Sequence, residues 1–112
     1  MNKFLVVNLI KQAIEADKAG NYIKAKNAYQ ELYDLFKCEL GEKHLTTLKV
    51  LNDLAIFYSY FGDYNKALEM NNAVYKARKE ILGENHPDTL SALHNLANSY
   101  SSLGDYNKAL EI

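Results

Sequence analysis

The segment Gly62-Asp63-Tyr64-Asn65-Lys66-Ala67-Leu68-Glu69 returns without change from Gly104 to Glu111. A weaker copy precedes it, beginning Gly20-Asn21-Tyr22. The glycines of the chain are evenly spaced, each numbered 21 above the one before: Gly20, Gly41, Gly62, Gly83 and Gly104. Two glycines therefore mark each repeat. A fixed 42-residue period of this kind indicates stacked structural units.

Each half of a repeat has the apolar spacing of one helix. Leu51, Leu54, Ala55 and Tyr58 stand at positions i, i+3, i+4 and i+7, which share one helical face. Alternation of the kind found in strands is absent from the sequence. We therefore expect an all-α fold of antiparallel helix pairs. The predicted helices cover residues 3–19, 22–40, 46–61, 64–82, 88–103 and 106–112.

The residues between the predicted helices have turn and capping chemistry. Glycine tolerates the left-handed φ of a helix end, and the Asp63 that follows Gly62 can cap the next helix. Pro87 suits a first helical turn, with Asn85 or His86 as the cap. His44 and His86 occupy the same site in successive repeats, which predicts a structural role such as capping.

Composition limits the classes of partner and compartment. The chain has 112 residues, the size of one domain, and 13 basic against 14 acidic residues give a net charge of −1. No basic excess points to nucleic acid or to an anionic membrane. The most apolar run, residues 4–10, is interrupted by Asn8 and is far shorter than the ~20 residues that span a bilayer. We expect a cytoplasmic protein.

No pattern typical of catalysis is present. The sequence contains no metal-ligand motif and no glycine-rich phosphate loop, because its glycines are isolated. Cys38 is the single cysteine, so it forms no internal disulfide, and no base is predicted to reach it. We expect no enzymatic activity, no cofactor and no metal.

The repeats at residues 51–67 and 93–109 resemble a tetratricopeptide repeat (TPR), in the 42-residue variety of kinesin light chains. The residues that carry the resemblance are Leu51, Leu54, Ala55, Tyr58, Gly62, Tyr64 and Ala67, and then Leu93, Leu96, Ala97, Tyr100, Gly104, Tyr106 and Ala109. The resemblance implies an α-α superhelix (a TPR solenoid) of about two and a half repeats. One array would comprise repeats over about 3–40, 46–82 and 88–112, the last truncated. We expect the chain to be a fragment of a longer array.

Three positions depart from the pattern. Gln12 stands where the other repeats have Leu54 and Leu96, and Ala16 stands where they have tyrosine. Asn71 replaces Tyr29 in the second helix of the middle repeat, where we expect looser packing.

In a solenoid of this kind, the first helix of each repeat lines a concave groove. The row beside its core face, here called the groove row, comprises Val7, Ile10, Lys11, Ile14 and Asp17 in the first repeat; Lys49, Asn52, Asp53, Ile56 and Ser59 in the second; and Ser91, His94, Asn95, Asn98 and Ser101 in the third. An asparagine carries both a donor and an acceptor and can pair with an extended backbone. In the resembling family, asparagine at the sites of Asn52 and Asn95 touches peptides.

The sequence thus predicts a protein-protein interaction scaffold that holds an extended peptide. The predicted peptide-binding residues are Lys49, Asn52, Ile56, His94, Asn95 and Asn98. A merely solvated polar face is equally compatible with Asn52 and Asn95. Two other functions stay open: a module that self-associates through Ile10, Ile14 or the truncated C-terminal end, and a peptide-sensing regulatory domain of a larger protein.

Overall fold

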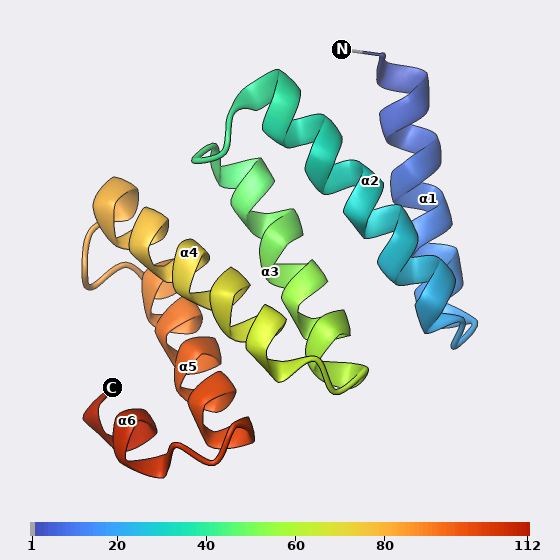
Figure 1. Cartoon of the computed structure of the whole chain (residues 1–112). Coiled ribbons are helices and arrows are strands. Elements are labelled where there is room, and N and C mark those ends of the chain that lie inside the picture. Colours follow the sequence, from blue (N-terminus) through green and yellow to red (C-terminus); the bar gives the residue numbers. More distant parts are fainter. Residues whose placement is uncertain (1) are drawn as a thin grey trace. The chain divides into compact units, whose positions relative to one another are not determined.

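The computed structural model describes residues 2–112, and all its regular structure within that range is helical (Figure 1). Six helices follow one another: α1 (Lys3–Lys18), α2 (Tyr22–Leu40), α3 (Leu45–Tyr60), α4 (Tyr64–Leu82), α5 (Pro87–Ser102) and α6 (Tyr106–Glu111). We name α1, α3 and α5 the A helices and α2, α4 and α6 the B helices. The starting positions of the A helices, and those of the B helices, keep the 42-residue period of the sequence. Every predicted helix is confirmed, with ends within one residue of those expected.

The helix ends follow the predicted chemistry. Gly62 has φ 84°, a left-handed conformation that turns the chain after α3. The Asp63 side chain then accepts a hydrogen bond from the Lys66 N–H, at 3.3 Å, and so caps α4. His86 Nδ1 accepts from the Asp88 N–H at 3.0 Å, and His44 Nδ1 accepts from the Thr46 N–H at 3.1 Å. The capping role predicted for the two histidines is confirmed.

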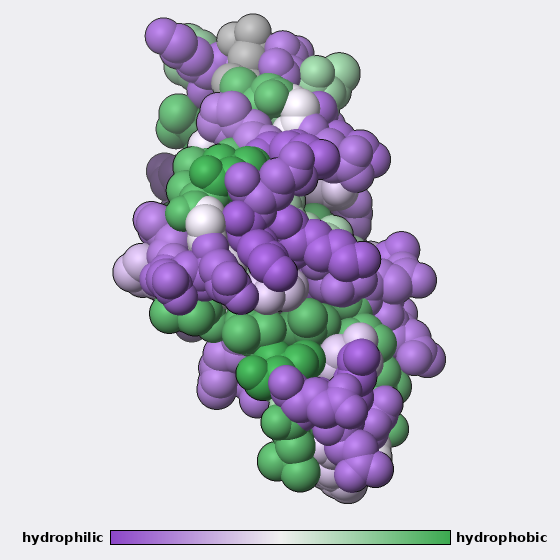
Figure 2. All heavy atoms as spheres, turned by 90° about the vertical axis from the view of Figure 1, so that its left-hand side faces the viewer, coloured by the Kyte–Doolittle hydropathy of each residue, from purple (hydrophilic) through white to green (hydrophobic). Residues whose placement is uncertain are grey.

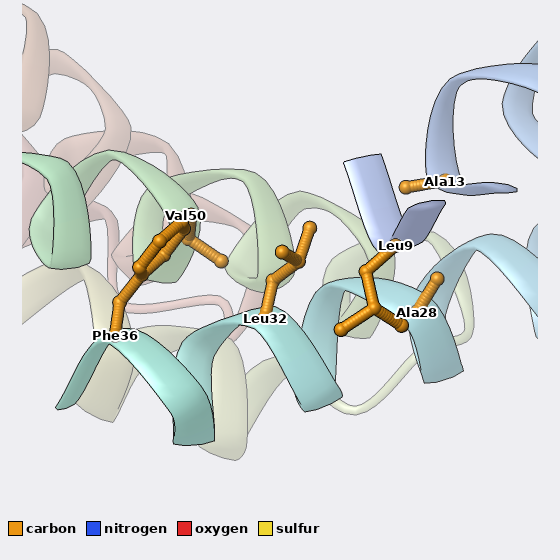
Figure 3. Close-up of a cluster of buried hydrophobic side chains, with 6 residues drawn as sticks. All are labelled: Leu9, Ala13, Ala28, Leu32, Phe36 and Val50. Atoms are coloured by element: carbon orange, nitrogen blue, oxygen red, sulfur yellow. The ribbon is translucent and has the colours of Figure 1, made fainter. Parts of the chain in front are cut away.

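The chain divides into two compact units, the first ending at Phe57 and the second running from Tyr58 to Ile112. In the first unit α1 and α2 lie side by side as an antiparallel pair (Figure 1). Figure 3 shows the core that joins them to α3, formed by Leu9, Ala13, Ala28, Leu32, Phe36 and Val50. Ala13 and Ala28 are small, so the helix backbones can approach closely. Burial of Leu32, which is 2% exposed, contributes about 1.5–3 kcal/mol.

A second, aromatic cluster closes the other end of this unit. Ala16, Ala25 and Phe57 are its buried members, and Tyr22 and Tyr29 pack against them. The rings of Tyr29 and Phe57 are 5.3 Å apart between centroids and tilted by 31°. This distance is typical of a favourable aromatic pair. The tyrosines here serve packing.

In the second unit α4 packs against α5, and α5 also contacts α6. The looser packing expected near Asn71 does not occur, because this side chain is 7% exposed and hydrogen-bonded. Its Nδ2 atom donates to Ser99 Oγ at 2.6 Å and lies 3.5 Å from the Asn95 carbonyl oxygen. A polar pair therefore holds α4 to α5.

The two units use different side chains at corresponding positions. Asn71 and Ser99 stand one full repeat after Tyr29 and Phe57, so a hydrogen bond replaces a ring contact. Arg78 likewise replaces the buried Phe36, and its Nη1 donates to the Asp88 carbonyl at 3.1 Å. The contact of α2 with α3 therefore uses aromatic and apolar packing, whereas the contact of α4 with α5 uses hydrogen bonds.

The surface is mostly hydrophilic on the face drawn in Figure 2, although hydrophobic side chains also remain visible there. Near the end of the chain Leu110 is 84% exposed, and Leu103 and Ile112 are each 38% exposed.

Candidate functional site

One face of α1 carries an open apolar cavity. Its volume is about 420 Å³, and its lining residues are Val7, Ile10, Lys11, Ile14, Glu15 and Lys18. Helical spacing gathers them, because positions 7, 11, 14 and 18 recur at intervals of three or four residues. Val7, Ile10 and Ile14 are 61%, 39% and 44% exposed, so three neighbouring apolar side chains remain in contact with water.

Four of the five residues predicted for the first groove row line this cavity. The exception is Asp17, which is not among the lining residues. Sequence reasoning missed Glu15 and Lys18, which continue the neighbouring ridge of the helix from Lys11. Glu15 lies four residues after Lys11, and Lys18 lies three residues after Glu15. This helical spacing was the signal that could have identified both residues.

On α3 the predicted site residues differ in how much of each side chain is available. Ile56 is 57% exposed and Asn52 is half-buried. Lys49 Nζ forms an ion pair with both carboxylate oxygens of Asp53, at 2.9 and 3.0 Å. This exposed i, i+4 pair contributes at most about 1 kcal/mol, so a ligand could redirect the ammonium group at small cost.

A tyrosine hydroxyl lies within the field of two groove-row carboxylates. Burial, then the negative charges of Asp53 and Asp17, raise the pKa of Tyr29 above its usual value. All three residues belong to the first unit, and they come from three different helices. The charged groove-row residues of this unit are thus mixed in sign, with Lys11 and Lys49 beside the two aspartates.

On α5 the predicted site residues share one face. His94 and Asn98 are both exposed and lie one helical turn apart, and Asn95, next to His94 in sequence, is half-buried. The Asn95 carbonyl oxygen accepts a hydrogen bond from Ser99 Oγ at 3.1 Å. Asn71 Nδ2 of α4 also lies 3.5 Å from this oxygen, so the backbone group takes part in the contact between α4 and α5.

Within residues 2–112 no group of three or more His, Cys, Asp or Glu side chains is placed to hold a metal ion. Cys38 is exposed and in the free thiol form. Over the same described range, no helix combines the length and apolarity that crossing a bilayer requires.

The comparisons with known proteins agree with the geometry. A family model described as tetratricopeptide repeat matches residues 13–80 and 57–112. The chain is similar in structure to the crystal structure of BtubC (BKLC) from P. vanneervenii, with a TM-score of 0.82 and 21% sequence identity. That likeness covers 98% of this chain and 44% of BtubC, so this chain spans less than half of the length of BtubC. A comparison with curated proteins found no match.

The tetratricopeptide fold is a scaffold that generally supports protein-protein interaction, and the all-α solenoid class expected from the sequence is confirmed. One repeating pattern, with small residues where helices approach and glycine at each turn, runs from Lys3 to Glu111. Because the family model covers all but the first twelve residues, the chain belongs to the tetratricopeptide repeat family.

Proposed function

We propose that this chain is a protein-protein interaction scaffold that binds an extended segment of a partner along its A helices. The observation that carries the proposal is the open apolar cavity on α1, lined by four residues of the predicted groove row. Its volume of about 420 Å³ lies in the range of small-ligand sites, about 300–1,000 Å³, and suits a few inserted side chains.

The side chains around the cavity define the chemistry of the partner segment. Val7, Ile10 and Ile14 would receive apolar side chains, since covering them removes apolar area from water. Lys11 and Lys18 would face acidic groups at the rim, and Glu15 limits the excess of positive charge. A segment of mixed character, with apolar residues and a small acidic excess, fits this surface.

The other predicted residues belong to the same proposal. On α3, Lys49, Asn52 and Ile56 offer a cation, an amide and an apolar side chain. On α5, His94, Asn95 and Asn98 offer hydrogen-bonding groups. Amides that pair with an extended backbone contribute about 0.5–1.5 kcal/mol each, which adds register more than affinity.

We also propose that the three repeats act as one array, without catalytic activity, in the cytoplasm. The scaffold character of the fold and the absence of a long apolar helix from the described residues support this proposal.

Self-association is the second candidate, because the same exposed isoleucines, Ile10 and Ile14, could pack against a second copy. A stable specific interface buries about 800 Å² on each partner. Three side chains that are 39–61% exposed offer much less apolar area than that. The limited area therefore favours a partner segment over a dimer.

The experiment selects peptides from a random phage-displayed library on the full chain and measures the affinity of a selected peptide by calorimetry. The test variant is Ile10→Gln with Ile14→Gln. The matched control is Ile23→Gln, which alters an isoleucine of α2 that is 65% exposed and outside the cavity. We expect at least tenfold weaker binding for the test variant and less than twofold change for the control.

Two outcomes contradict the proposal. Equal affinity for the test variant would remove the cavity from the site. Sedimentation that shows a dimer of the unaltered chain, dissociated by Ile10→Gln with Ile14→Gln, would support self-association instead. Separate Asn52→Ala and Asn95→Ala variants test the amides, and we expect each to weaken binding by about 1 kcal/mol.

A further inference from the structure

Each A helix that follows a B helix turns one face toward it. In α3 this face carries Val50 and Phe57, which pack against α2. In α5 the corresponding face carries Ser99, which is hydrogen-bonded to Asn71 of α4. We call this surface of an A helix its stacking face. Its members are buried in both helices: Val50, Leu54 and Phe57 in α3, and Ala92, Leu96 and Ser99 in α5.

On α1 the corresponding positions are polar. Subtracting 42 from the α3 positions gives Asn8, Gln12 and Glu15, and all three side chains are exposed. The face that α1 turns toward its own partner α2 stays apolar and buried, through Leu9, Ala13 and Ala16. The stacking face has therefore become polar, and the groove row has also changed, because Val7 and Ile10 stand where α3 has Lys49 and Asn52.

The apolar row of the cavity lies on a third face, although Glu15 of the stacking face also borders the cavity. At about 100° per residue, the stacking face, the α2-facing residues and the row Val7, Ile10 and Ile14 point about a third of a turn apart around α1. A helix that packed on the stacking face would not bury the centre of this apolar row. The exposure of Ile10 and Ile14 is therefore not explained by an absent repeat helix.

We propose that α1 is a capping helix, whose stacking face stays hydrated and does not bind a B helix that has the apolar side chains of α2. Covering it with the face that α2 turns toward α3, which carries Leu32 and Phe36, would remove water from two amides and a carboxylate and supply no partners for them. An unpartnered buried amide costs about 1–3 kcal/mol, and an unpaired buried charge costs more.

The test extends the array by one repeat. A second copy of residues 3–44 is joined directly ahead of Lys3 of the full chain, which preserves the 42-residue period. One fusion keeps the original α1 unaltered. The other carries Asn8→Val, Gln12→Leu and Glu15→Phe in that helix, which gives it the stacking-face residues of α3. Hydrogen exchange of the added copy of α2 and thermal unfolding are measured for both fusions.

We expect the added repeat to dock only on the substituted helix. In the fusion with unaltered α1, the amides of the added α2 exchange quickly and the melting temperature of the chain is unchanged. In the substituted fusion their exchange slows at least tenfold and the melting temperature rises, because stacking neighbours stabilise one another.

Two results would overturn the proposal. The first is equal protection of the added α2 on unaltered α1. The second is rapid exchange in both fusions, provided that circular dichroism shows the substituted chain to be helical without the added repeat. If the substituted chain does not fold, the fusion with unaltered α1 still decides between docking and refusal.

Discussion

Thr47 and Thr89 are corresponding residues that bury a hydroxyl group without a hydrogen-bond partner among the described residues. Both side chains are 0% exposed, in the first turns of α3 and α5. A buried hydroxyl without a partner costs about 1–3 kcal/mol, although its methyl group still packs. At this position threonine therefore contributes through the packing of its side chain and not through a hydrogen bond.

We expect Thr47→Val and Thr89→Val each to stabilise the chain by about 1 kcal/mol, because valine keeps the shape and removes the unpaired hydroxyl. Urea denaturation measures the change. Ser99→Ala is the matched control, since this buried hydroxyl is hydrogen-bonded to Asn71, and its loss should cost about 1–3 kcal/mol. Destabilisation by both valines would show that the hydroxyls do have partners.

The raised pKa of Tyr29 predicts that the stability of the folded chain falls at alkaline pH. Burial and the charges of Asp53 and Asp17 raise its pKa in the folded state above the ordinary 10.0. The folded state therefore holds this proton more tightly than the unfolded state, so the stabilisation is complete below pH 10 and is lost as pH rises through the folded pKa. We expect Tyr29→Phe to reduce the fall in melting temperature between pH 9 and 11. Identical pH profiles for the two proteins would contradict this assignment.

Between neighbouring helices, each contact of a B helix with the following A helix uses a matched pair. Tyr29 and Phe57 join α2 to α3 through their rings, whereas Asn71 and Ser99 join α4 to α5 through a hydrogen bond. The positions are the same and the chemistry differs. A pair with one residue from each set would place an amide or a hydroxyl against an aromatic ring. The polar group would then lack a hydrogen-bond partner, and the ring would lose its aromatic contact.

A double-mutant cycle tests this matching. We expect Tyr29→Asn and Phe57→Ser each to destabilise the chain, the latter by about 3–5 kcal/mol, because a large buried ring is lost. The double variant should cost at least about 1 kcal/mol less than the sum, since asparagine and serine can then pair as they do in the second unit. Strict additivity in chemical denaturation would show that the pair is not coupled.

Over the length of a repeat protein, stability is the sum of units and of contacts between neighbours. Core residues of one unit should therefore govern the opening of that unit most strongly. Leu32 is the central buried residue of the cluster in Figure 3, where it lies between Leu9 and Phe36. Removing it should loosen α1 and α2 first.

We expect Leu32→Ala to destabilise the chain by about 2–5 kcal/mol through the lost burial and the cavity it leaves. Hydrogen exchange resolved along the chain should accelerate most in α1 and α2 and least in α4 and α5. Val74→Ala, at the corresponding position of α4, is the control with the opposite pattern. Equal acceleration in all helices for both variants would show that the chain opens as one unit.

The period, the helices and their ends were all predictable from the order of the amino acids. Gly62 and Asp63 stop one helix and cap the next through contacts within a few residues, so local chemistry is sufficient there. The row that lines the α1 cavity was also predictable, because helical spacing alone places Val7, Ile10 and Ile14 on one face.

The departures from the pattern, in contrast, are resolved by packing between distant parts of the chain. From the sequence, Asn71 predicted loose packing. The structure shows that it is hydrogen-bonded to Ser99, which is 28 residues away in sequence. The roles of Arg78, Thr47 and Thr89 depend in the same way on what surrounds them. Burial and hydrogen bonding between distant residues follow from how the helices pack, and the period of a sequence carries no information on them.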